Sequence, residues 1–168
     1  MATQQTAQIT IDDVCDYVVV RLNEASTPLS VLKLHKLLYY IQAWHLAFFG
    51  ARFCSASFQA WVHGPVNRQL YDRFKDTKSM YSRVAKRDIR PGFSIDQLGE
   101  PAARHIDSIL EAYADFADTQ LEELTHRERP WLSAREGYEP NERCEVIISE
   151  DLMREYYAAR LQHPGASD

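Results

Sequence analysis

Six histidines are the side chains in this sequence best suited to chemistry: His35, His45, His63, His105, His126 and His163. No two of them form the H-E-x-x-H motif, or an i, i+4 pair on one helix, that is typical of zinc enzymes. A site would have to be assembled by the fold, and the best candidates are His45, His63 and His126. One hypothesis is therefore a hydrolase or metal-dependent enzyme built on these three, although their spacing predicts no metal.

The other chemical motifs of common enzymes are missing from the sequence. Cys15, Cys54 and Cys144 are widely spaced and form no C-x-x-C pair, which argues against a disulfide framework or a zinc knuckle. Only Cys54 lies near His45 and His63 in the sequence, as a Cys-His nucleophile would require. There is also no G-x-S-x-G, Walker or G-x-G-x-x-G motif. We expect a binding protein with no catalytic residues and no cofactor.

Composition favours one domain with an acidic surface. The chain has 168 residues, 45% of them hydrophobic, and a formal net charge of -5. An acidic chain is poorly suited to bind duplex DNA unless it builds a local positive patch. Four basic residues within one short segment, Arg83, Lys86, Arg87 and Arg90, are the only candidates for such a patch. A DNA-binding autoregulator is therefore a second alternative, and direct nucleic-acid binding is not the expected function.

The segment from Phe58 to Val66 sets an aromatic side chain and a histidine beside a forced turn. Gly64 frees the backbone and Pro65 fixes φ, which predicts a corner at residues 63–65, an extended entry at residues 61–63 and a helix from Val66 onward. Two interpretations stay open: Trp61 is a core residue with His63 bonded to backbone, or both side chains are displayed for recognition.

A long apolar helix is the main element that must position this corner. It is expected to begin near Thr27-Pro28 or Ser30 and to end at Phe49, with Gly50 as its C-terminal glycine. At helical spacing one continuous arc contains Leu34, Leu37, Leu38, Ile41, His45, Phe48 and Phe49. So wide an arc predicts a central helix with neighbours on most of its surface.

The remaining pattern predicts a mainly α, single compact domain of about six helices with a short extended or β element near the Trp-Val-His-Gly-Pro corner. The other expected elements are a helix capped by Thr10, a helix to about Asp76, a long loop over 77–100 with a short strand at 93–95, a helix from Pro101 to Phe116, a short helix capped by Thr119, a turn at Pro130-Trp131 and a last helix after Ser149. Residues 1–9 are expected to be flexible, 10–161 to form the domain and 162–168 to be disordered.

Several short motifs in this order resemble the Panacea domain, a family of antitoxins. They are Lys33–His45 (KLHKLLYYIQAWH), Ala60–Val66 (AWVHGPV), Leu70-Tyr71, Leu124-Thr125-His126, Pro130-Trp131 and Ile148-Ser149. The resemblance covers roughly residues 10–160. It departs from the family pattern at His35, where glutamine is usual, and at Ile41, where alanine is usual.

The resemblance implies an antitoxin that binds and neutralises a cognate protein toxin. It carries a narrower implication as well, namely a proteolytic adaptor that delivers the toxin to the ClpXP protease. Because the N-terminal run lacks a basic and apolar signal segment and no apolar stretch is long enough to span a bilayer, we expect a cytoplasmic protein without a membrane partner.

The motifs also divide the candidate residues into two groups. The toxin-binding candidates are Trp61, His63 and Tyr71, or, if the corner is buried, the loop with Arg83, Lys86, Arg87 and Arg90. The motif scaffold comprises Lys33, Tyr39, Gln42, Trp44, His45, Gly64, Pro65, His126 and Trp131. We expect Trp61 and His63 to tie the corner onto the long helix that carries Gln42 and His45.

Overall fold

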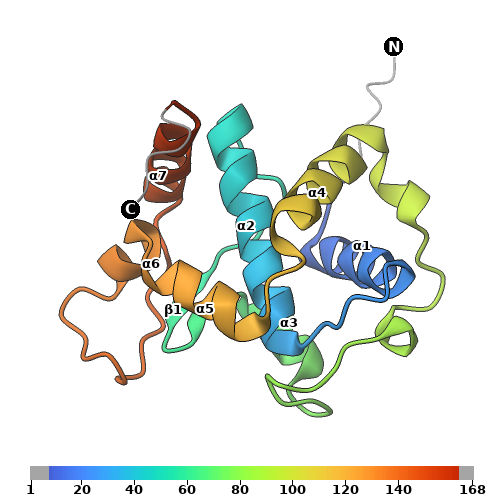
Figure 1. Cartoon of the computed structure of the whole chain (residues 1–168), viewed down its shortest axis with the longest axis horizontal. Coiled ribbons are helices and arrows are strands. Elements are labelled where there is room, and N and C mark those ends of the chain that lie inside the picture. The colour runs from blue at the N-terminus through green and yellow to red at the C-terminus, as the bar shows by residue number, and fades with distance from the viewer. Residues whose placement is uncertain (1–7, 163–168) are drawn as a thin grey trace.

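Helix α2 (Val31–Phe49) lies at the centre of the fold, with helices from both ends of the chain around it (Figure 1). The computed structural model describes residues 8–162. Within them the elements are α1 (Ile11–Glu24), α2, β1 (Gln59–Trp61), β2 (Gly64–Val66), α3 (Arg68–Phe74), the 3-10 turns η1 (Lys86–Asp88) and η2 (Ile95–Leu98), α4 (Glu100–Tyr113), α5 (Asp118–His126), α6 (Arg129–Ala134) and α7 (Glu150–Gln162). Seven α-helices and a two-stranded sheet confirm the mainly α prediction in the described part of the chain.

The termini of the predicted domain are described only in part. Residues 1–7 and 163–168, where flexible and disordered segments were expected, lie outside the described residues. Helix α7 extends to Gln162, the last residue described. No helix within residues 8–162 is long and apolar enough to cross a bilayer.

The first two helices begin where their capping residues predict. The Thr10 hydroxyl accepts the Asp13 amide at 3.1 Å, and the Asp13 carboxylate accepts the Thr10 amide at 3.0 Å, a reciprocal capping box. The Ser30 hydroxyl accepts the Lys33 amide at 3.1 Å at the start of α2. Gly50 ends that helix with φ at +67°, the left-handed conformation that glycine adopts without strain.

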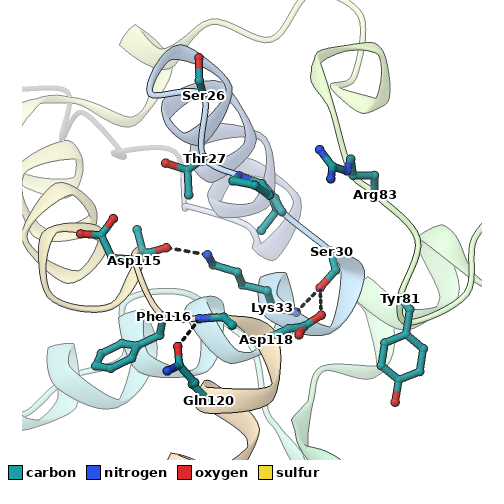
Figure 2. Close-up of a pocket in the computed structure, with 14 residues that line it drawn as sticks. Ser26, Thr27, Ser30, Lys33, Tyr81, Arg83, Asp115, Phe116, Asp118 and Gln120 are labelled. Atoms are coloured by element: carbon teal, nitrogen blue, oxygen red, sulfur yellow. Dashed lines mark hydrogen bonds between the residues drawn. The ribbon is translucent and has the colours of Figure 1, made fainter.

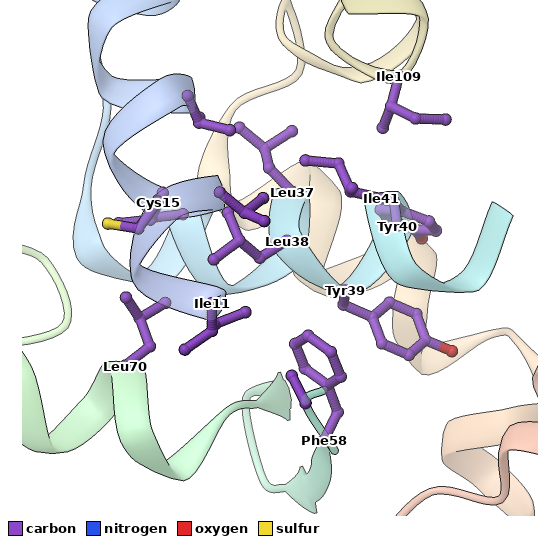
Figure 3. Close-up of a cluster of buried hydrophobic side chains, with 14 of the residues drawn as sticks. Ile11, Cys15, Leu37, Leu38, Tyr39, Tyr40, Ile41, Phe58, Leu70 and Ile109 are labelled. Carbon is purple, nitrogen blue, oxygen red and sulfur yellow. The ribbon is translucent and has the colours of Figure 1, made fainter. Parts of the chain in front are cut away.

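Helix α2 is buried on nearly every side. Fourteen of its 19 residues are buried, and α1, α4, α5 and α7 all pack against it. Figure 3 shows the largest cluster, in which Ile11 and Cys15 of α1 meet Leu37 and Leu38, while Phe58 lies next to Tyr39. Burial of this apolar surface supplies the main driving force for folding.

The last turn of α2 departs from the predicted apolar arc. Phe48 and Phe49 are 49% and 65% exposed, and His45 is only half-buried. In Figure 1 this end of α2 lies away from α3 and α5. Periodicity gave the correct face, but it cannot show where along a helix the packing partners end.

A β-hairpin replaces the predicted corner and the start of the next helix. Strands β1 and β2 pair antiparallel, Trp61 opposite Gly64 and Ala60 opposite Pro65, so the turn lies at residues 62–63. Val66 is therefore in a strand rather than a helix, and α3 begins after Asn67, whose side-chain oxygen accepts the Leu70 amide at 2.8 Å. The Asn67 cap, two residues beyond Pro65, determines where the helix starts.

The far side of β1 is bonded to the segment before α7. The Ala60 amide donates to the Val146 carbonyl at 2.9 Å, and the Ile148 amide donates to the Phe58 carbonyl at 2.8 Å. Strand β1 is thus bonded to β2 on one edge and to residues 146–148 on the other.

The long loop over 77–100 contains η1 and η2, and the predicted strand at 93–95 is absent. The Ser94 hydroxyl accepts the Asp96 amide at 3.3 Å, and Ile95 begins η2. A serine that satisfies a nearby amide favours a local turn over pairing with a distant strand. The loop is fixed at its start, where the Val31 amide donates to the Ser82 carbonyl at 3.1 Å and the Val84 amide donates to the Leu29 carbonyl at 2.9 Å.

Two helix boundaries in the second half differ from the predictions. Helix α4 ends at Tyr113, so Phe116 lies in the following turn and is 40% exposed. Helix α5 begins at Asp118 without the Thr119 cap, because the Gln120 side chain accepts the Ala117 amide at 2.8 Å and shifts the capping position two residues earlier. The predicted Ser149 cap of the last helix is confirmed by a bond from the Leu152 amide at 3.2 Å.

Candidate functional site

The three predicted anchors Trp61, His63 and Tyr71 line one groove of about 600 Å³ beside the hairpin. We name it the hairpin groove. Its walls are mainly apolar and include Val62, Val66, Met80 and Cys144. The structure therefore brings together side chains from the hairpin, α3 and the segment that precedes α7.

Trp61 and Tyr71 form a fixed aromatic wall. Their ring centroids are 4.9 Å apart in an edge-to-face arrangement, and the Trp61 indole donates to the Gln59 side chain at 2.8 Å. The Arg68 guanidinium lies 5.9 Å from the Trp61 ring and 5.4 Å from the Tyr71 ring. Both rings are half-buried, so each presents apolar surface with little remaining freedom, as interface anchors do.

His63 occupies the tip of the hairpin and is not bonded to backbone. Its Nδ1 atom lies 2.7 Å from the Glu122 carboxylate on α5, and its side chain is 57% exposed. The imidazole therefore joins the hairpin tip to α5 while most of its surface stays open to a partner. This position supports the display interpretation over a buried turn residue.

The rim of the groove carries more positive than negative charge. Glu145 is shared by two arginines, with Arg143 at 2.8 Å and Arg68 at 3.4 Å. The hydrogen bond from Arg143 holds the pKa of the Glu145 carboxyl below its usual value. Arg68 also pairs with Asp72 on α3 at 3.5 Å, so Arg143, whose side chain is 84% exposed, is the guanidinium best placed to meet an acidic group of a partner.

A buried lysine supports the hairpin from below. Lys36 is fully buried, and its ammonium nitrogen donates to the Pro65 carbonyl at 3.0 Å. Burial lowers the pKa of this lysine to about 7, although the charge of Glu122 acts in the opposite direction. Sequence reasoning did not identify Lys36, and the available signal was a lysine in the most apolar run of the chain.

Gly64 fits against this lysine only because it has no side chain. A Cβ atom there would lie 2.6 Å from Lys36 Cε and 2.9 Å from Thr125 Oγ1, and its φ of +106° disfavours any other residue. The hairpin backbone is thus in direct contact with α2 and α5.

His35 holds the other end of β2. Its Nδ1 atom accepts the Asn67 amide at 3.2 Å, and burial lowers its pKa well below the usual value, so the ring is neutral. Its Nε2 atom has no hydrogen-bond partner among the residues described. His35 and Lys36, adjacent on α2, therefore fix the two ends of one strand.

The hairpin packs on the long helix that carries Gln42 and His45, as expected, but the bonds that hold it there come from Lys36 and His35 rather than from Trp61 and His63. The Gln42 amide group instead donates to the carbonyls of Cys54 and Ala56 at 2.8 and 3.1 Å, holding the loop that follows α2. His45 lies 2.6 Å from the Ala51 carbonyl. His35 and Lys36 thus hold the hairpin on α2 through its backbone. The sequence does not reveal these contacts, because their partners are backbone atoms.

His126 and Trp131 support the hairpin from its outer side. Their rings stack with centroids 4.1 Å apart, and the Trp131 indole donates to the Trp61 carbonyl at 2.9 Å. Desolvation lowers the pKa of His126. His45 belongs to a different cluster with Phe49 and His105, so the three histidines are not brought together. No group of three metal-ligating side chains occurs within residues 8–162.

Tyr39 and Trp44, the remaining scaffold residues of the long helix, act inside the protein. Tyr157 donates to the Glu128 carboxylate at 2.7 Å and to the Tyr39 hydroxyl at 3.2 Å. The Trp44 indole donates to the Tyr113 hydroxyl at 2.8 Å. These contacts join α2 to α4 and α7 and offer no surface to a partner.

The four basic residues of the loop do not act as one patch. Arg90 bonds Asp16 at 2.5 Å and Asp13 at 2.7 Å, so it stabilises the packing of the loop on α1. Arg83 lines a separate pocket, and Lys86 and Arg87 are exposed on η1. The Cys-His hypothesis also loses support, because burial raises the pKa of the Cys54 thiol to about 12.

Comparison with known proteins identifies the region that contains this site. A family model described as the antitoxin SocA-like Panacea domain matches residues 34–132. No curated protein and no solved structure matches the chain. The matched range covers more than half of the sequence and includes α2 from Leu34 onward, the hairpin, Tyr71 and the His126–Trp131 stack. The chain therefore belongs to the antitoxin SocA-like Panacea domain family, in agreement with its sequence motifs.

Proposed function

We propose that this protein is an antitoxin that binds its cognate protein toxin in the hairpin groove. The observation that carries the proposal is the convergence of Trp61, His63 and Tyr71 in one mainly apolar groove, within the region that matches an antitoxin family. A few rigid aromatic side chains in a desolvated pocket usually dominate the energy of a protein interface.

The groove favours one kind of toxin segment. Its apolar walls accept an aliphatic or aromatic side chain, and the exposed guanidinium groups of Arg68 and Arg143, which share Glu145, favour a neighbouring acidic residue. This acidic group then accepts hydrogen bonds from Arg68 or Arg143, which bond Glu145 in the free protein.

Substitution of the anchors tests the location of the site. Trp61→Ala and Tyr71→Ala are each expected to weaken binding of the toxin, a protein encoded beside this one, by about 2 kcal/mol, roughly 30-fold in Kd. Phe49→Ala is the matched control, because Phe49 is an exposed aromatic outside the groove. Isothermal titration calorimetry measures all three. Equal affinity for all variants would place the toxin elsewhere, and failure of the wild-type chain to form a complex would remove toxin binding itself.

A narrower proposal is that the chain acts as a proteolytic adaptor and presents the bound toxin to ClpXP. Its support is the family membership, and it requires a cytoplasmic protein. The test follows toxin degradation by purified ClpXP with and without this protein. Faster degradation that disappears with Trp61→Ala is expected, and an unchanged rate would leave direct blockage of the toxin as the mechanism.

A further inference from the structure

A second pocket, of about 560 Å³, lies between the loop after α1, the start of α2 and the turn between α4 and α5 (Figure 2). We name it the Lys33 pocket. It shares no lining residue with the hairpin groove. Its volume is in the usual range for small-ligand sites.

Lys33 forms the floor of this pocket with a buried ammonium group. The side chain is 6% exposed, and Nζ donates to the Ala114 carbonyl at 2.5 Å. An ammonium has three N–H donors, and Lys33 forms no ion pair among residues 8–162. Burial lowers the pKa of Lys33, and the carboxylates of Asp115 and Asp118 act in the opposite direction without pairing directly with it, so a ligand anion near Nζ would add a favourable contact.

Arg83 supplies a second cation on a rigid backbone. The bonds between residues 82–84 and 29–31 hold its main chain, and Lys78 donates to its carbonyl at 2.9 Å. Its guanidinium projects at the pocket wall in Figure 2 and has no side-chain partner within the described range. The pocket thus offers two cationic groups that form no ion pair among residues 8–162.

Two carboxylates balance this charge and restrict the ligand. Asp118 accepts the Ser30 hydroxyl at 3.1 Å and the Thr119 amide at 2.7 Å, so its oxygens are partly bonded. Asp115 is exposed and forms no ion pair in the part of the chain described. Because two carboxylates accompany the two cations, the pocket disfavours a highly charged anion such as phosphate. It favours a ligand that carries one carboxylate together with an N–H donor.

Exposed aromatic side chains complete the lining. Tyr81 and Phe116 are 64% and 40% exposed, and Figure 2 places them at the edge of the pocket. Exposed aromatic surface favours contact with an apolar group of a ligand.

We propose that the Lys33 pocket binds an α-amino carboxylate with an apolar side chain. The carboxylate accepts from Lys33 and Arg83, the adjacent nitrogen donates to Asp115, and the side chain contacts Tyr81 or Phe116. A free amino acid and the C-terminal residue of a peptide share this chemistry.

Calorimetric titration with three probes tests the ligand class: phenylalanine, N-acetyl-glycyl-phenylalanine and the amide of that dipeptide. At least one carboxylate probe is expected to bind, with the amide at least ten-fold weaker. Binding of phenylalanine alone identifies a free amino acid as the ligand, and binding of the dipeptide identifies a chain end. An amide that binds equally well, or no binding of either carboxylate at about 10 mM, overturns the proposal.

Variants of the pocket test the roles of its cations. Lys33→Met and Arg83→Ala are each expected to weaken the bound carboxylate probe at least ten-fold, with Lys86→Ala, an exposed cation on η1, as the matched control. The Arg83 side chain is not part of the packing, so Arg83→Ala remains informative if Lys33→Met fails to fold. If Arg83→Ala binds the carboxylate probe as tightly as the wild type, the proposed role of Arg83 as the second cation is refuted. If the same variant binds the toxin normally, the Lys33 pocket is independent of toxin binding in the hairpin groove.

Discussion

Replacing Gly64 with alanine tests whether the hairpin is held against α2 as described. The new Cβ atom would lie 2.6 Å from Lys36 Cε and 2.9 Å from Thr125 Oγ1. These distances are shorter than carbon and oxygen atoms tolerate, so the hairpin, the lysine or α5 must shift. Since Lys36 is fully buried and donates to Pro65, it has little room to move.

The expected cost has two separable parts. A side chain at a φ of +106° adds backbone strain of about 1–2 kcal/mol, and the overlap adds about 1–3 kcal/mol of overpacking. Gly50→Ala is the matched control, because Gly50 has φ at +67° and no atom within 4 Å of the added Cβ. It should show the strain alone, about 1–2 kcal/mol.

Urea unfolding of both variants measures the difference in free energy of unfolding. The Lys36→Ala background completes a double-mutant cycle, in which Gly64→Ala should cost about 1–3 kcal/mol less because the nearest atom is gone. Toxin affinity should fall with Gly64→Ala and not with Gly50→Ala. Equal costs for the two glycines, or no coupling to Lys36, would refute the close contact.

Three further predictions concern buried polar groups. Burial lowers the pKa of Lys36 in the folded protein to about 7, so between pH 7 and about 9.5 the unfolded chain binds a proton that the folded chain lacks. The free energy of unfolding should therefore rise with pH in this range, by at most about 1.4 kcal/mol per pH unit. Urea titrations at several pH values measure this slope, and Lys36→Met should remove it. Tyr157→Phe removes a donor to the buried Glu128 carboxylate and should cost about 1–3 kcal/mol in thermal unfolding, while Tyr81→Phe at an exposed site should cost nothing measurable. Asp16→Asn leaves two guanidinium groups without their buried carboxylate and should cost about 3–5 kcal/mol in urea unfolding; a cost below about 1 kcal/mol would contradict the importance of that contact.

Local signals in the sequence predicted the helical part of the fold. Thr10, Ser30 and Gly50 bound α1 and α2 because caps act on backbone groups within a few residues. The prediction that Thr119 caps α5 was wrong, because the Gln120 side chain bonds the Ala117 amide and caps the helix two residues earlier. The β-hairpin was misread as a corner because its pairing is set jointly by the strands and by the segment near Val146, which is distant in sequence.

Residue types in the sequence pointed to the side chains that line the hairpin groove, but they did not point to two of the buried residues that support it. Trp61, His63 and Tyr71 stand out by residue type beside a turn, and the structure places all three in one groove. Lys36 and His35 hold the hairpin through Pro65 and Asn67 backbone atoms about 30 positions away. No residue type in the hairpin signals such a contact, because the partner is a carbonyl or an amide that every residue possesses.

Lys36 supports the hairpin through backbone contacts that do not depend on the side chains at the hairpin tip. It acts on the Pro65 carbonyl and on the space left by Gly64, whereas the side chains of Val62 and His63 at the tip take no part in it. Exchange of tip residues therefore leaves the Lys36 contact intact and removes only the bond between His63 and Glu122. Under the proposed function, changing the two tip residues and the facing segment at 141–145 would redirect binding to a different toxin, while the central helix keeps its sequence.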